Sequence, residues 1–198
     1  PGGFRPIKPG VRSFVARVAG GSPPNPSLYS TQNNNPYLPR VYLNAGRFYT
    51  IVVAGTIPAS GNIPYGTLPF ILLSDDVLPG PIVNGVTQAR FKVLHAAPYT
   101  GSSVTLYIVP GGTPLPRPIT EYASQGSASY RSISGYLNVN PGTYTITLTR
   151  SNGIIVAQQV VTFEEGEVKT MVLQNTSASG SGTANHKLTV VTDHQYGG

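Results

Sequence analysis

Short runs of β-branched and aromatic residues, each bounded by Gly, Pro, Asn or Ser, recur throughout the second half of the chain. This pattern is typical of an all-β sandwich, in which short strands are separated by turns. Asn152-Gly153 is a strong hairpin signal between two of these runs. The runs that predict strands are Ala89–Pro98, Ser103–Val109, Ser134–Val139, Thr143–Thr149, Ile154–Phe163, Val168–Leu173 and Lys187–Asp193, with a weaker edge candidate at Tyr122–Tyr130.

The first half of the chain has fewer strand signals and longer loops. Val11–Val18 alternates, and the face with Phe14, Ala16 and Val18 is the more apolar one. A loop of about 20 residues, rich in Asn, Pro and Ser, then separates this run from the next strand candidates, and loops of that length tend to serve function or assembly. The later strand candidates of this half are Val41–Leu43, Phe48–Ala54 and Phe70–Leu73.

An internal repeat links the two halves. Val41–Val52 aligns without gaps to Val161–Val172, which pairs Gly46 with Gly166, and Leu72–Asp75 aligns to Val190–Asp193. A competing match of Tyr42–Asn44 to Tyr136–Asn138 is shorter and lacks the final strand. Both halves therefore end in the same strand, Gly turn, strand, loop and strand.

The two copies of this repeat differ in what precedes them. Only 45 residues lie before Gly46, whereas about 80 separate Gln88 from Gly166. We therefore expect two immunoglobulin-like antiparallel β-sandwich domains, of which the N-terminal one is incomplete and has unpaired strand edges. The predicted organisation is an N-terminal arm with the first strand (1–18), a short β domain (19–79), a linker (80–87) and a complete sandwich (88–198).

Composition limits the classes of function. Only 10% of the residues are charged, so the surface is largely neutral and favours association. The formal net charge of +6 is dispersed, apart from a basic start, which argues against nucleic acid as the main partner. The chain has no cysteine, and therefore no disulfide or thiolate metal site, and no apolar run reaches the roughly 20 residues that span a bilayer.

Several polar residues invite a chemical interpretation, but each has a plainer one. His95 could act as a base, although a histidine at a strand end more often fixes a turn. Asp75, Asp76 and Asp193 fall at matching strand ends, where capping is more common than calcium binding. The acidic cluster around Gly166 lies on one turn and lacks the second carboxylate across a cleft that glycoside hydrolysis needs.

The remaining candidates carry weaker signals. His186 and His194 flank the last strand without metal-ligand spacing, and the 12 tyrosines, in a chain without tryptophan, suit interfaces better than sugar stacking. Asn175-Thr176-Ser177 matches a glycosylation sequon. We expect no catalytic residue, cofactor or metal.

The chain resembles the family called domain of unknown function 4397. The residues that carry the resemblance are His95-Ala96-Ala97-Pro98, the turn and strand Asn140–Ile146, and the strand Gly166–Val172. The resemblance covers about 88–193, with 40–76 similar to the end of a preceding copy. It implies a secreted or surface-exposed β-sandwich, often in tandem, without an established activity.

These observations predict a non-enzymatic extracellular structural protein, at the cell or spore surface, that self-assembles into a fibre or surface layer by β-strand exchange between copies. The candidate donor strand contains Val11, Phe14, Ala16 and Val18. The alternative is a cell-surface carbohydrate-binding or adhesion module that acts as a monomer. A hydrolase that uses His95 is the third possibility.

Overall fold

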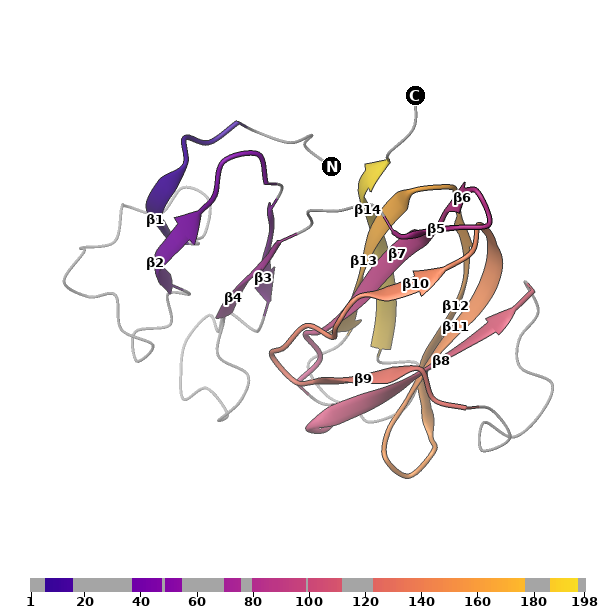
Figure 1. Cartoon of the computed structure of the whole chain (residues 1–198). Helices are drawn as coiled ribbons and strands as arrows, with labels where there is room; N and C mark the ends of the chain where they lie inside the picture. The colour runs from indigo at the N-terminus through magenta and orange to yellow at the C-terminus, as the bar shows by residue number, and fades with distance from the viewer. Residues whose placement is uncertain are drawn as a thin grey trace, which may run out of the picture. The chain divides into compact units, whose positions relative to one another are not determined.

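A computed structural model shows that the chain is all-β (Figure 1). No helix able to span a membrane occurs in the part of the chain that the structure describes. The chain divides into two compact units, Pro1–Val77 and Leu78–Gly198. The structure describes residues 6–15, 37–47, 49–54, 70–75, 80–98, 100–111, 123–176 and 186–195.

The second unit contains two four-stranded sheets. The first sheet has the order β10-β7-β13-β14. Its β7–β13 pair is parallel, so it departs from the antiparallel pairing that was predicted, whereas the other two pairs in this sheet are antiparallel. The strands are β7 (Ala89–His95), β10 (Leu137–Val139), β13 (Glu167–Asn175) and β14 (His186–Gln195).

The second sheet is antiparallel throughout and has the order β12-β11-β8-β9. The predicted hairpin at Asn152-Gly153 is confirmed, since it joins β11 to β12 with Gly153 at a φ of 79°. The weak strand predicted within Tyr122–Tyr130 forms the edge of this sheet. The strands are β8 (Ser103–Pro110), β9 (Gly126–Ser129), β11 (Gly142–Thr149) and β12 (Ile155–Phe163).

One hydrophobic core lies between these sheets and confirms the sandwich. Alternate residues of each strand point inward, as the period of two requires. Phe91 of β7 and Phe163 of β12 come from opposite sheets, and their ring centroids are 5.2 Å apart. Val93, Leu106, Ile146, Met171 and Leu173 are almost fully buried around them.

The segment predicted as a linker, 80–87, instead contains a β-hairpin of the second unit. It pairs β5 (Ile82–Val83) with β6 (Val86–Thr87). Asn84 and Gly85 have φ values of 53° and 79°, as a type I′ turn requires. The backbone N–H of Thr87 donates to the Glu165 carboxylate over 2.8 Å, and the Gly166 N–H donates to the Thr87 carbonyl. These bonds fix the hairpin to the sandwich.

The first unit contains two separate antiparallel ladders in its described part. β1 (Gly10–Val15) pairs with β2 (Tyr37–Leu43), and β3 (Tyr49–Ala54) pairs with β4 (Phe70–Asp75). A bulge in β2 places Arg40 at a φ of 45°, where its N–H donates to Ser13 Oγ over 3.3 Å. The predicted positions Ala16 and Val18 lie outside the described residues.

Candidate functional site

The internal repeat is also present in the structure. Gly46 and Gly166 have φ values of 68° and 67°, so both turns need the left-handed conformation that glycine adopts freely. The Gly166 turn connects β12 in one sheet to β13 in the other, and the Gly46 turn connects β2 and β3, which belong to different ladders. β13 pairs antiparallel with β14, as β3 does with β4. Thus β2, β3 and β4 correspond to β12, β13 and β14.

The correspondence extends to β1, which the sequence comparison missed. Gly10 is the register partner of Leu43, and Gly142 is the register partner of Phe163, the repeat equivalent of Leu43. Gly10 and Gly142 both have positive φ, 115° and 149°, and each follows a proline. β1 therefore corresponds to β11. The Pro-Gly pair at the start of each strand is the sequence feature that indicates this correspondence.

The corresponding strands differ in their neighbours. β13 is flanked by β14 and β7, and β11 by β12 and β8. Among the described residues, β3 pairs only with β4, and β1 pairs only with β2. One edge of β3 and one edge of β1 are therefore unpaired there, and unpaired edges readily accept another strand.

Apolar side chains beside these edges are more exposed than their counterparts. Ile51 on β3 is 40% exposed, whereas its equivalent Met171 is fully buried in the sandwich core. Phe14 on β1 is half-buried, whereas its equivalent Ile146 is fully buried. The exposure differs because β7 and β8 lie beside β13 and β11 in the second unit and add their own apolar side chains to the core. We use the term open edge for the unpaired edges of β1 and β3 together with Phe14 and Ile51.

His95 ends β7 in a closed environment. It is fully buried, its Nδ1 accepts the Ala97 N–H over 3.3 Å, and its ring packs edge-on against Tyr130 at 5.6 Å between centroids. Burial lowers the pKa of His95 to about 4, the Gly101 backbone opposes this change, and His186 adds to it. His95 is therefore neutral at pH 7 and fixes the turn after β7, the plainer role expected from its position.

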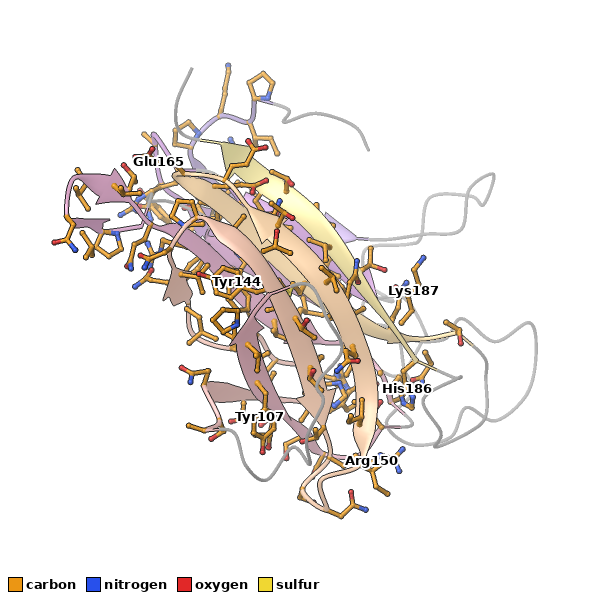
Figure 2. All side chains as sticks on the ribbon, turned by 90° about the vertical axis from the view of Figure 1, so that its right-hand side faces the viewer. Tyr107, Tyr144, Arg150, Glu165, His186 and Lys187 are labelled. Atoms are coloured by element: carbon orange, nitrogen blue, oxygen red, sulfur yellow. The ribbon has the colours of Figure 1, made fainter. Side chains whose placement is uncertain are left out.

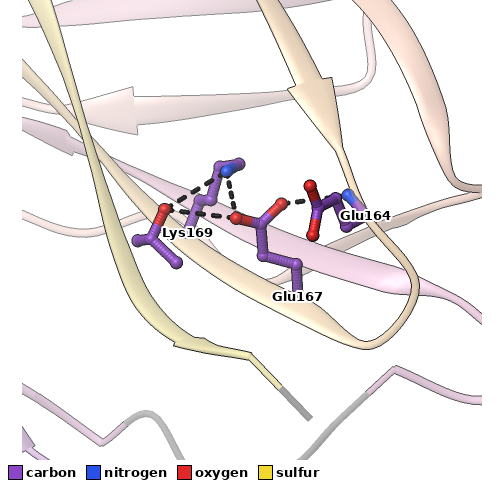
Figure 3. Close-up of polar contacts among 4 residues, drawn as sticks. Glu164, Glu167 and Lys169 are labelled. Carbon is purple, nitrogen blue, oxygen red and sulfur yellow. Dashed lines mark hydrogen bonds and ion pairs between the residues drawn. The ribbon is translucent and has the colours of Figure 1, made fainter. Parts of the chain in front are cut away.

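The acidic turn after β12 is also engaged in internal bonds (Figure 3). Glu167 forms a buried ion pair with Lys169 and accepts the Glu164 N–H over 3.0 Å. Lys169 Nζ also donates to Thr192 Oγ1, which donates in turn to Glu167. Figure 2 labels Glu165 and His186 near opposite ends of the sandwich, so this turn and His186 do not share one site.

Asp193 forms a cross-strand bond. Its carboxylate accepts the hydroxyl of Thr170 over 2.5 Å, and both side chains are buried. The repeat places Thr50 and Asp75 at the equivalent positions; the side chain of Asp75 and all of Asp76 lie outside the description. In the described part of the chain, no group of three or more His, Asp or Glu side chains is arranged to hold a metal ion.

Two cations on β7 gather around one tyrosine. Lys92 is 1% exposed and donates to the Tyr136 hydroxyl over 2.9 Å. The Arg90 guanidinium lies 4.3 Å from the centroid of the Tyr136 ring, and Lys92 Nζ lies 4.8 Å from it. The Lys92 charge is therefore covered, and the half-buried Arg90 lies against the same ring.

The other candidates are dispersed. His186 is buried at the start of β14, opposite Asn175, while the side chain of His194 is not described. Asn175 is half-buried at the end of β13. Tyr42 is 65% exposed on β2, whereas Tyr144 contacts Phe163 in the sandwich. His186 and Asn175 are register partners, whereas Tyr42 and Tyr144 lie on other strands.

One family model matches most of the second unit. No curated protein matches the chain significantly. The model of a family described as "Domain of unknown function (DUF4397)" matches residues 89–197, which are more than half of the chain and include the whole sandwich from β7 to β14. The chain belongs to the domain of unknown function 4397 family.

Proposed function

We propose that this protein is a non-enzymatic structural protein of the cell exterior, and that it assembles with copies of itself by β-strand pairing. The observation that carries the proposal is the open edge. Ile51 is 40% exposed at a position whose equivalent is fully buried in the second unit. Covering such a side chain while pairing the adjacent backbone gains apolar burial and hydrogen bonds together.

The remaining surface supports association. Few charges oppose close contact between copies, since only 10% of the residues are charged. The β5–β6 hairpin adds another exposed apolar surface, formed by Ile82, Val83 and Val86. An isolated two-stranded ladder is marginal in water, so the ladders of the first unit gain most from a partner.

Strand pairing in this proposal involves an edge rather than a free arm. β1 is already paired with β2 of its own chain, so Val11 and Phe14 can meet a neighbour only through the other edge of β1. The expected donor strand thus becomes a resident strand with one open side. The proposed partner is another copy of the chain, and no nucleic acid takes part.

The described polar clusters favour a structural role over catalysis. His95 is neutral and inaccessible at pH 7, and Glu167 is paired with Lys169. A general base needs access to a substrate proton, and a nucleophile needs a base beside it. Neither His95 nor Glu167 meets these requirements.

Sedimentation velocity and negative-stain electron microscopy over a wide concentration series test this proposal. We expect the mass to rise with concentration and ordered assemblies to form without any added ligand. A chain that stays monomeric throughout, and binds surface glycans saturably, would instead support the adhesion module.

A further inference from the structure

The first unit corresponds to one half of the second. Its strands β1, β2, β3 and β4 match β11, β12, β13 and β14 in order, in turn glycines and in ladder partners. The half without a counterpart in the described part of the first unit is β7 to β10. In the complete domain, that half supplies the central neighbours of β11 and β13.

Building on the self-assembly proposed above, we infer that the occupant of the open edge is the first unit of a second copy. The two units face each other across a two-fold axis, with β1 paired to β1 and β3 paired to β3. The resulting sheets have the orders β2-β1-β1-β2 and β4-β3-β3-β4. Each contains four strands, as do the sheets of the complete sandwich. Contacts of this isologous kind form a closed dimer.

Strand direction is compatible with this arrangement. A two-fold axis perpendicular to the sheets makes both new central pairs antiparallel. The central β11–β8 pair of the complete domain is also antiparallel, so the β1–β1 pair repeats its direction. The β3–β3 pair differs in direction from its counterpart in the complete domain, because the β7–β13 pair is parallel. Antiparallel pairing is at least as stable as parallel pairing.

The apolar faces are self-complementary. In the complete domain, Ile146 and Met171 join one core with Phe91 and Leu106 of the other half. In the dimer, Phe14 and Ile51 of one copy pack against Phe14 and Ile51 of the other, so the same side chains supply both halves of the core. Ile51 then becomes buried from its 40% exposure without needing any other sequence as partner.

The few charges that the first unit carries are mostly basic, and this gives the contact a recognisable salt dependence. Residues 1–77 contain six basic and two acidic residues, a net charge of +4 for each unit. Two such units repel each other at low ionic strength, and salt screens that repulsion. The dimer therefore becomes tighter as salt is added.

The absence of cysteine from the natural chain allows a direct test. Ser13→Cys places one thiol on the exposed face of β1, and Ser127→Cys places a matched thiol on the exposed edge strand β9 of the other unit. With a short bis-maleimide, we expect covalent dimers from the Ser13→Cys chain and few from the Ser127→Cys chain. Equal crosslinking of the two would overturn the inference.

Sedimentation of two further variants identifies the contact. Ile51→Lys should weaken dimerisation about tenfold or more, because each copy places a charge in the new core. Tyr42→Thr installs the residue of the equivalent position, Thr162, and should leave the affinity nearly unchanged. If Ile51→Lys leaves the dimerisation affinity unchanged, this inference is wrong, although the proposal of self-assembly still holds. A monomer at every concentration would defeat both, and the crosslinking result does not depend on how well the Ile51→Lys chain folds.

Discussion

His95 makes the stability of the sandwich depend on pH in a defined direction. Replacing it by Asn keeps a side-chain acceptor for the Ala97 N–H but removes the titrating ring. The native side chain is fully buried, and burial is the main reason why its pKa falls from 6.5 to about 4. The unfolded chain therefore binds a proton more readily than the folded chain between these two values.

The sign and size follow from this difference in pKa. Above pH 6.5, His95 is neutral in both states and exerts no penalty. As the pH falls towards 4, the unfolded state takes up the proton and the folded state is disfavoured. One pKa unit corresponds to about 1.36 kcal/mol, so the penalty reaches about 3 kcal/mol below pH 4.

Urea unfolding of the wild type and of His95→Asn at a series of pH values measures this penalty. The carboxylates and the other two histidines are common to both chains, so the difference between the two curves isolates His95. We expect His95→Asn to be the less stable chain at pH 7 and to lose about 3 kcal/mol less than the wild type between pH 7 and 4. Parallel curves, or an NMR titration of His95 near 6.5, would refute the reasoning.

Three further substitutions test a turn, a buried ion pair and a buried hydrogen bond of the second unit. Gly85→Ala should lower the free energy of unfolding by about 1–2 kcal/mol in thermal unfolding, because Gly85 has a φ of 79°. Gly135→Ala is the control and should change little, because both glycines lie in open space but Gly135 has no left-handed φ. Lys169→Met should cost about 3–5 kcal/mol in urea unfolding, because it leaves Glu167 buried without its cation, and a second change of Glu167→Leu should recover much of the loss. Tyr136→Phe should cost about 1–3 kcal/mol by the same assay, because it removes the hydroxyl that accepts from buried Lys92; an unchanged midpoint would show that this bond contributes nothing.

The strands of the sandwich were predictable because their signals are local. Alternation places Val104 and Leu106 on one face of β8, and both are buried in the core. Asn152-Gly153 specifies a tight turn by its backbone preferences alone, and the structure contains that hairpin. The repeat was also detectable, since its turn glycines Gly46 and Gly166 share one conformation.

The features that sequence reasoning missed depend on contacts between distant segments or on very short elements. The parallel β7–β13 pair joins strands that lie far apart in the chain. Lys92 is buried beside Tyr136, 44 residues away, and the alternation within β7 alone does not reveal this contact. Asn84-Gly85 was overlooked because the strands beside it are only two residues long.

The open edge itself could be only partly anticipated. The shortness of the first copy predicts an incomplete domain, and the apolar alternation of Val11–Val18 predicts a strand that could be donated. The sequence of β1 shares little with β11 beyond Pro9-Gly10 and Pro141-Gly142. Only the pairing register of Gly10 with Leu43 identifies β1 as a resident strand. A donor strand and a resident strand have the same apolar alternation, so the sequence alone does not distinguish them.

Hydrogen exchange of β3 amides tests most directly whether the open edge pairs between copies. In a two-stranded antiparallel ladder, every second backbone N–H of β3 faces away from β4 and exchanges freely. We predict that these amides exchange rapidly in dilute protein and become protected as concentration rises, while β13 is protected along both edges at every concentration. The account is contradicted if the same β3 amides exchange at one rate across the whole series.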